Sequence, residues 1–159
     1  MARPTTRLNP KKRYLQVALN STLEDAHEII SQLPISDRII VEAGTPLIKR
    51  YGEHGIRQIR QWYEQHLSGQ MLTTSASPSV SVASLLFQAA FSQSSPLLTK
   101  KAITVKSENE IFPYVVADLK TMDRGETEVE IAALGGATAA IALGTARIES
   151  LNSFVEKCE

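Results

Sequence analysis

Three charged residues follow one apolar run in the second half of the sequence. In the segment VVADLKTMD, Asp118 and Lys120 stand two residues apart, and Asp123 follows three residues later. Side chains two apart on a strand point to the same face, so Asp118 and Lys120 are expected to lie together. Carboxylates beside a lysine keep it protonated, and a protonated lysine can donate a proton to, or stabilise, a carbanion or enediolate. The segment therefore predicts a catalytic site.

A second carboxylate, Glu42, ends another apolar run, in the segment VEAGTPLIK, where residues 44–46 are expected to turn the chain sharply. If the two runs are parallel strands, their carboxyl ends meet at one rim and the two carboxylates converge there. Such a pair suits a hard divalent ion such as Mg²⁺. Taken alone, Glu42 could instead pair with Lys49 or Arg50, and Asp118 could be a helix cap.

Strands and helices are expected to alternate along the chain. Short apolar runs predict buried strands over residues 14–19, 39–42, 114–117 and 139–143. Helical patterns follow each of them, over about 21–33, 53–67, 126–134 and from 148 onward. The first helix is expected to begin at Ser21, with Glu24 completing a capping box. This alternation predicts an α/β fold with a parallel sheet.

The spacing of the strands predicts part of a barrel with an insertion. Residues 14 and 39 begin successive runs 25 positions apart, as do residues 114 and 139. That is the unit size of a (β/α)₈ TIM barrel, whereas 75 positions separate residues 39 and 114. Four parts of the chain are therefore expected: a basic arm over 1–13, two βα units over 14–67, an insertion with a linker and a short helix over 68–111, and two further units over 112–159.

Composition limits the classes of partner. The 159 residues have zero net charge, 43% hydrophobic and 21% charged residues, which argues against nucleic-acid or membrane binding. The basic cluster at Lys11, Lys12 and Arg13 is interpreted as a solvated arm, with a phosphate-contacting or RNA-binding arm as the alternative. A single cysteine, Cys158, excludes an internal disulfide. The apolar stretch at 80–91 is too short to span a bilayer. A soluble, cytoplasmic protein is expected.

Four strings resemble one known family. YLQVALN, VEAGTPLIK, VVADLKTMD and AAIALGTA resemble, in order, the first four strand segments of 3-hexulose-6-phosphate synthase. That family lies in the orotidine 5′-phosphate decarboxylase superfamily, whose D-x-K-x-x-D signature fits Asp118, Lys120 and Asp123. The resemblance covers roughly residues 14–67 and 112–159.

The resemblance implies a lyase that joins formaldehyde to D-ribulose 5-phosphate, or reverses that reaction, through an enediolate with Mg²⁺ as cofactor. It implies that Glu42 and Asp118 are metal-site carboxylates and that Lys120 stabilises the enediolate or moves its proton. Asp123 would complete the catalytic site, typically of the neighbouring subunit in a dimer. Asn20, where the family usually has aspartate, and Thr45 are implied to bind substrate.

The matching strings reach only the fourth strand, so half a barrel is expected, without the later loops that grip the substrate phosphate. Open sheet edges then call for a partner, either a second copy in a homodimer or a complementing half-barrel chain. Two other activities stay open: decarboxylation of orotidine 5′-phosphate or of 3-keto-L-gulonate 6-phosphate. A non-catalytic half-barrel subunit that acts through protein association is a further alternative.

Overall fold

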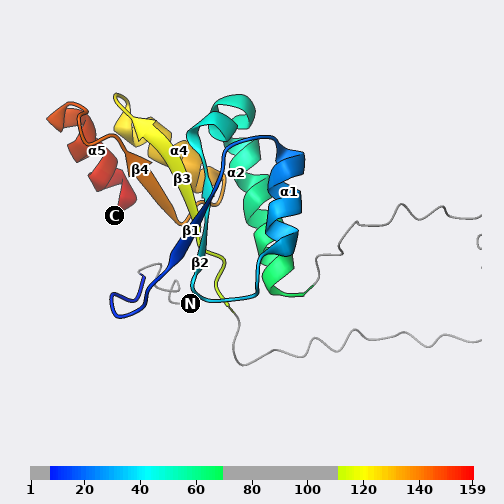
Figure 1. Cartoon of the computed structure of the whole chain (residues 1–159). Coiled ribbons are helices and arrows are strands. Elements are labelled where there is room, and N and C mark those ends of the chain that lie inside the picture. Colours follow the sequence, from blue (N-terminus) through cyan, green and yellow to red (C-terminus); the bar gives the residue numbers. More distant parts are fainter. Residues whose placement is uncertain (1–7, 70–110) are drawn as a thin grey trace, which may run out of the picture. The chain divides into compact units, whose positions relative to one another are not determined.

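The computed structural model describes residues 8–69 and 111–159, where four strands alternate with four helices (Figure 1). The strands are β1 (Leu15–Leu19), β2 (Ile39–Ala43), β3 (Val115–Thr121) and β4 (Ala139–Ala142). The helices are α1 (Leu23–Gln32), α2 (Thr45–Leu67), α4 (Gly125–Leu134) and α5 (Ile148–Cys158). The predicted alternation is confirmed. Most of the predicted basic arm and nearly all of the predicted insertion lie outside the described residues.

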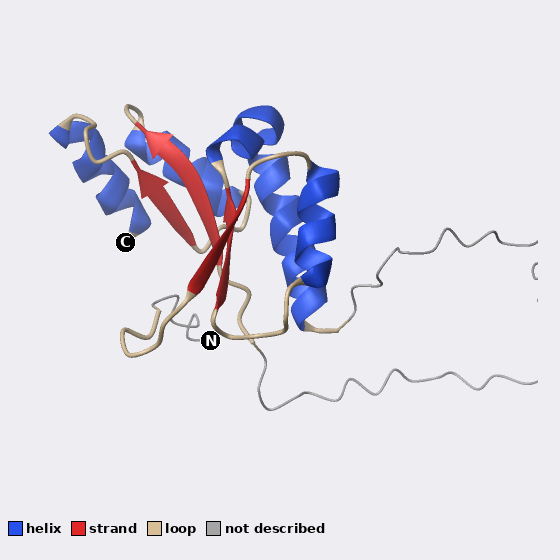
Figure 2. Ribbon diagram, in the orientation of Figure 1, coloured by secondary structure: helices blue, strands red, loops and turns tan. Residues whose placement is uncertain are grey.

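The strands form one parallel sheet in the order β1-β2-β3-β4 (Figure 2). Each strand therefore pairs with the next along the chain, through a connection that contains a helix. Such connections are almost always right-handed, so successive helices cover the same face of the sheet. This arrangement is half of a (β/α)₈ barrel, with the helices as its outer layer.

The hydrophobic core lies between the sheet and its helices. Alternate residues of the central strands, such as Val41, Val115 and Ala117, are fully buried and pack against Ile30 of α1 and Ile56 of α2. The intervening residues point to the other face, which is the interior side of a barrel. Helix packing thus fixes which face each polar strand residue occupies.

Tyr63 ties α2 to β2 inside this core. Its ring is 1% exposed, and its hydroxyl donates to the carbonyl oxygen of Ile39 at 2.9 Å. Burial raises the pKa of Tyr63 to about 12, because desolvation disfavours the phenolate. The Tyr63 hydroxyl is therefore neutral in the folded state and can donate this hydrogen bond.

Helix α2 departs from the sequence-based prediction in two ways. It begins at Thr45 with Gly44 as its N-cap and Pro46 in its first turn, so residues 44–46 start a helix rather than form a separate turn. Proline at this position costs no backbone hydrogen bond, because the first amides of a helix have no partner within it. Gly52 then kinks the helix, with φ 59° and ψ −146°, and the predicted start near residue 53 marks the segment after the kink.

The start of α1 was predicted one residue early. Thr22, not Ser21, is the N-cap, and its hydroxyl accepts a hydrogen bond from the Asp25 amide at 3.2 Å. Ser21 instead donates to the Asp25 carboxylate. The hydrogen bond from Ser21, followed by hydrogen bonds from the backbone and side chain of Thr22 to the carboxylate, lowers the pKa of Asp25, since these bonds favour its charged form.

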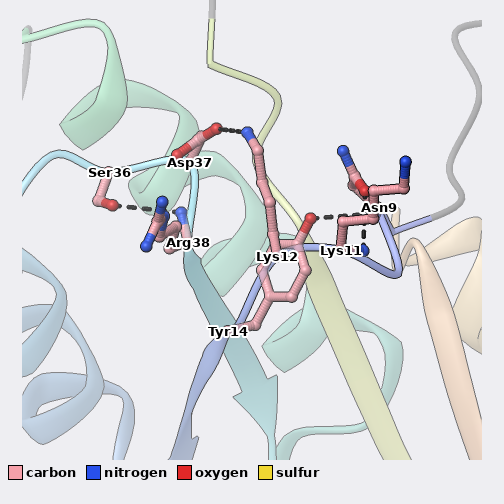
Figure 3. A network of polar contacts seen from close by, with 7 residues as sticks. All are labelled: Asn9, Lys11, Lys12, Tyr14, Ser36, Asp37 and Arg38. Carbon is pink, nitrogen blue, oxygen red and sulfur yellow. Dashed lines mark hydrogen bonds and ion pairs between the residues drawn. The ribbon is translucent and has the colours of Figure 1, made fainter.

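The amino ends of β1 and β2 are joined by a polar network (Figure 3). Lys12 forms an ion pair with Asp37, and the Asn9 amide donates to the Tyr14 hydroxyl at 3.0 Å. The hydrogen bond from Lys12 lowers the pKa of Asp37. This network lies at the rim opposite the carboxyl ends of the strands, away from the residues expected to do chemistry.

No helix of residues 8–69 and 111–159 is both long and apolar enough to cross a membrane.

Candidate active site at the carboxyl rim

The end of β3 holds the predicted Asp118 and Lys120 together. Lys120 donates to, and forms an ion pair with, the Asp118 carboxylate at Oδ2. Their contact was predicted, but the backbone achieves it differently from a regular strand. Lys120 has φ 48°, in the left-handed region, and the pairing with β4 shifts between Asp118 and Thr121. A non-glycine residue in that region costs about 1–3 kcal/mol, and such conformations cluster at functional sites.

Asp118 is anchored by one carboxylate oxygen and leaves the other free. The Thr45 hydroxyl lies 2.8 Å from the backbone oxygen of Asp118 and 3.0 Å from its Oδ2. Oδ2 thus receives Thr45 and Lys120, whereas Oδ1 is buried and has no hydrogen-bond partner in the described part of the chain. A buried carboxylate oxygen without a partner is costly, so this atom suits a cation or a substrate hydroxyl.

Glu42 occupies the same face of the sheet as Asp118. The register pairs Glu42 with Val116, two residues before Asp118. Strand spacing and rise then separate the Cα atoms of Glu42 and Asp118 by about 8 Å. The Glu42 carboxylate accepts a hydrogen bond from Gln16, which lies on the same face of β1. Gln16 was not among the predicted residues, although an amide inside an apolar strand was a signal that could have revealed it.

Asn20 follows β1 directly and lies against Gly44. A Cβ atom at position 44 would fall 2.0 Å from the Asn20 Oδ1 and 2.8 Å from its Cγ, so only glycine allows this contact. The Gly44 amide also donates to the Leu19 carbonyl oxygen at 3.0 Å. Asn20 is thereby held at the carboxyl rim, beside the start of α2.

The structure does not bring Asp123 into this cluster. Asp123 is exposed in the loop between β3 and α4, and among the described residues no hydrogen bond or ion pair joins it to Asp118 or Lys120. Thr45 is engaged with Asp118 through its hydroxyl and is 9% exposed. Its observed contacts are therefore with the backbone oxygen and the carboxylate of Asp118.

The carboxylates of Asp118 and Glu42 fit a Mg²⁺ site in which other groups complete the coordination. Within residues 8–69 and 111–159, no three His, Cys, Asp or Glu side chains are grouped closely enough to hold a metal by themselves. Mg²⁺, however, is usually bound by one or two carboxylates together with substrate and water. The free, buried Oδ1 of Asp118 and the carboxylate of Glu42 are suitable ligands of this kind.

Fold and rim together define the described part as half of a (β/α)₈ barrel with a polar site at the carboxyl ends of its strands. The fold is similar to the crystal structure of 3-hexulose-6-phosphate synthase from Salmonella typhimurium, with a TM-score of 0.55 and 22% identity. The match covers 91% of this chain and 46% of that chain, which agrees with half a barrel.

Sequence relatives agree with this fold. The chain is 33% identical over 147 residues to the bifunctional enzyme Fae/Hps of Methanococcoides burtonii and 31% identical over 145 residues to that of Methanosarcina acetivorans. Each match covers 91% of this chain but 25% of the relative, so the chain spans about a quarter of the length of these enzymes. No family model matches the sequence. The predicted resemblance to 3-hexulose-6-phosphate synthase is confirmed.

Proposed function

We propose that the chain provides the enediolate-forming half of an aldehyde-lyase of the 3-hexulose-6-phosphate synthase type. One observation carries the proposal: Asp118 holds Lys120 through one oxygen and leaves its other, buried oxygen free, on the face that also carries Glu42. The named relatives are enzymes, and the similar structure is a 3-hexulose-6-phosphate synthase. None of these observations favours orotidine 5′-phosphate or 3-keto-L-gulonate 6-phosphate as the substrate.

The proposed reaction is an aldol cleavage or its reverse. In the cleavage direction, a C–C bond of hexulose 6-phosphate breaks and its electron pair stays on the sugar as the enediolate of ribulose 5-phosphate. One proton leaves the hydroxyl that becomes the carbonyl of formaldehyde, and one proton returns to the sugar carbon. The Lys120 ammonium stabilises the enediolate oxygen or moves its proton, and its ion pair with Asp118 holds it beside the carboxylate.

Glu42 and Asp118 would hold Mg²⁺, which would supply positive charge beside the developing oxyanion. Asn20 and Thr45 would contact a bound sugar at the same rim, and the hydrogen bond from Thr45 to Asp118 supports a role there. Asp123 would act in a site other than that of its own chain, which its exposed loop position allows.

A partner would supply the strands and phosphate-binding loops of the remaining half, either as a second copy or as a complementing half-barrel chain. In the described part, β1 and β4 each pair with only one neighbouring strand. Leu15 on β1 is 62% exposed and Ile141 on β4 is 36% exposed. Covering these edges removes apolar surface from water and satisfies strand backbone groups. We place the assembly in the cytoplasm, with no nucleic acid or membrane as partner.

Formaldehyde release from hexulose 6-phosphate tests the proposal. The full chain, assayed with the partner that closes its barrel and with and without Mg²⁺, is expected to release formaldehyde only with the ion, and Lys120→Met should lower the rate at least about 100-fold. Lys49→Met is the matched control, because Lys49 is also an exposed lysine but lies on α2 outside the site. Equal rates for both variants, or formaldehyde release that does not depend on Mg²⁺, would contradict the proposal. Orotidine 5′-phosphate, offered in parallel, should not be decarboxylated.

A further inference from the structure

The irregular end of β3 determines where Lys120 lies. Asp118 pairs with Ile141, but the next paired residues are Thr121 and Ala142. Leu119 and Lys120 are therefore additional residues in β3, with no counterpart in β4. Bulges of this kind re-aim side chains and are common next to active sites.

The bulge needs a restraint, because it is unfavourable in itself. Lys120 adopts φ 48°, where a Cβ atom is crowded against the following backbone, and a lysine gains nothing locally from that conformation. A regular strand would also direct Thr121 to the face opposite Asp118 and Lys120, and it would need no additional residues in β3. Something beyond Lys120 must hold the chain in its observed course.

Thr121 provides that restraint immediately after the bulge. It is 1% exposed, and its hydroxyl donates to the Glu128 carboxylate in α4. Its backbone oxygen accepts a hydrogen bond from the Leu143 amide at 3.1 Å. Glu128 lies near the amino end of α4, where the helix dipole favours a negative charge. The pair thus fixes β3 to α4 one residue beyond Lys120.

We propose that Thr121 and Glu128 are positioning residues that hold the bulge and thereby keep Lys120 on Asp118. This inference rests on the proposed function for its meaning, because it assigns the pair to the placement of the catalytic lysine. The inference also makes a structural claim: the Lys120–Asp118 ion pair depends on the Thr121 hydroxyl one residue away. This dependence can be measured without any substrate.

Competitive acetylation of lysines tests this dependence. The full chain is treated with a small amount of acetic anhydride, and mass spectrometry gives the labelling rate of Lys120 relative to Lys49. In Thr121→Val, which keeps the shape but loses the hydroxyl, the ratio should rise about two- to five-fold, as for loss of an exposed ion pair. Thr121→Ser retains the hydroxyl and should restore the ratio of the parent chain.

Thr138→Val is the matched control for general loosening. The Thr138 hydroxyl accepts from the Val115 amide and from the Arg60 guanidinium, each at 3.3 Å, so its loss removes hydrogen bonds at the other end of the same strand pair, far from Lys120. Its labelling ratio should not change. If Thr121→Val does not fold, Glu128→Met makes the same comparison, because it keeps a side chain of similar length and removes the carboxylate acceptor.

An unchanged ratio in the variant that removes the pair, or an equal rise in Thr138→Val, would overturn the inference. Failure of the proposed function is a separate result: the parent chain would release no formaldehyde, whatever the labelling ratios. If formaldehyde is released but the labelling ratio is unchanged, the proposed lyase function stands and only the positioning role of Thr121 and Glu128 is contradicted.

Discussion

At the scale of single residues, the sequence predicted that Asp118 and Lys120 meet, but not how the backbone brings them together. The spacing of Asp118 and Lys120 correctly predicted their contact, but on the assumption of a regular strand. The structure reaches that contact through a bulge and a left-handed lysine, which no alternation pattern contains. Thr45 reaches Asp118 across 73 positions of sequence, so this contact appears only in the folded chain.

Gly44 offers a test of the packing at the rim. Gly44→Ala should lower the free energy of unfolding by about 1–3 kcal/mol, because its Cβ overlaps the Asn20 side chain. The backbone itself tolerates alanine, since Gly44 has φ −72°. Gly144→Ala, where nothing lies within 4 Å of the added carbon, should stay within about 0.5 kcal/mol of the parent chain.

The double variant Gly44→Ala with Asn20→Ala separates the two sources of strain. It should recover part of the lost stability, because the overlapping amide is gone while the approach to the Leu19 oxygen, at 3.0 Å, remains. Urea unfolding of the parent chain, Gly44→Ala, Asn20→Ala and the double variant measures the coupling. Additive effects would mean that Asn20 does not lie over Gly44 in solution.

At the scale of elements, periodicity and spacing predicted the four strands and the helices that follow them. The end of β3 and the start of α2 were missed for the same reason. Residues 118–121 and 44–46 are polar or contain glycine and proline, and their conformation is set by contacts with other elements rather than by local pattern. The kink at Gly52 was likewise not predicted, because an isolated glycine is compatible with a continuous helix.

Tyr63 predicts how the α2–β2 contact responds to alkali. Because burial raises the pKa of Tyr63 from 10 to about 12, its stabilisation is complete below pH 10 and is lost as pH rises through 12. The parent chain should therefore lose on the order of 2–3 kcal/mol over this range from this group alone.

Tyr63→Phe isolates that contribution in urea unfolding at pH 8 and pH 11. At pH 8 the variant should be less stable by about 1 kcal/mol, because the hydrogen bond to the Ile39 carbonyl is gone. Toward pH 11 the difference should shrink or reverse. Tyr51→Phe, at a half-buried ring, should leave the pH dependence unchanged. A constant difference between Tyr63→Phe and the parent at all pH values would contradict the burial argument.

At the scale of the whole molecule, the described residues form half of a barrel, and Glu42, Asp118 and Lys120 lie toward the carboxyl ends of its strands. The sequence predicted the half barrel from the unit spacing of 25 residues and from the four strand strings. It could not predict what closes the sheet, because partner contacts leave no periodic signal in one chain. The match covers 46% of the similar synthase chain, in agreement with this division.

Solution mass distinguishes the two proposed partners. Closure by a second copy predicts a light-scattering mass of about twice the 17.4 kDa of one chain, with Leu15 and Ile141 protected from solvent. Leu15→Glu should then shift the protein toward one chain, whereas Ile29→Glu, on the exposed side of α1, serves as a surface control. A mass of one chain at every concentration would leave only a separate complementing chain.

The most direct test of the central claim follows the enediolate itself. Nuclear magnetic resonance in D₂O can detect solvent deuterium entering the C1 position of ribulose 5-phosphate, a step that needs neither formaldehyde nor bond formation between carbons. The chain, with Mg²⁺ and the partner that closes its barrel, is predicted to catalyse this exchange, and Lys120→Met and Asp118→Asn are predicted to abolish it while remaining folded. Absence of exchange in the folded parent chain, or an equal rate in Lys120→Met, would contradict the assignment of this rim as the catalytic half of a sugar-phosphate lyase.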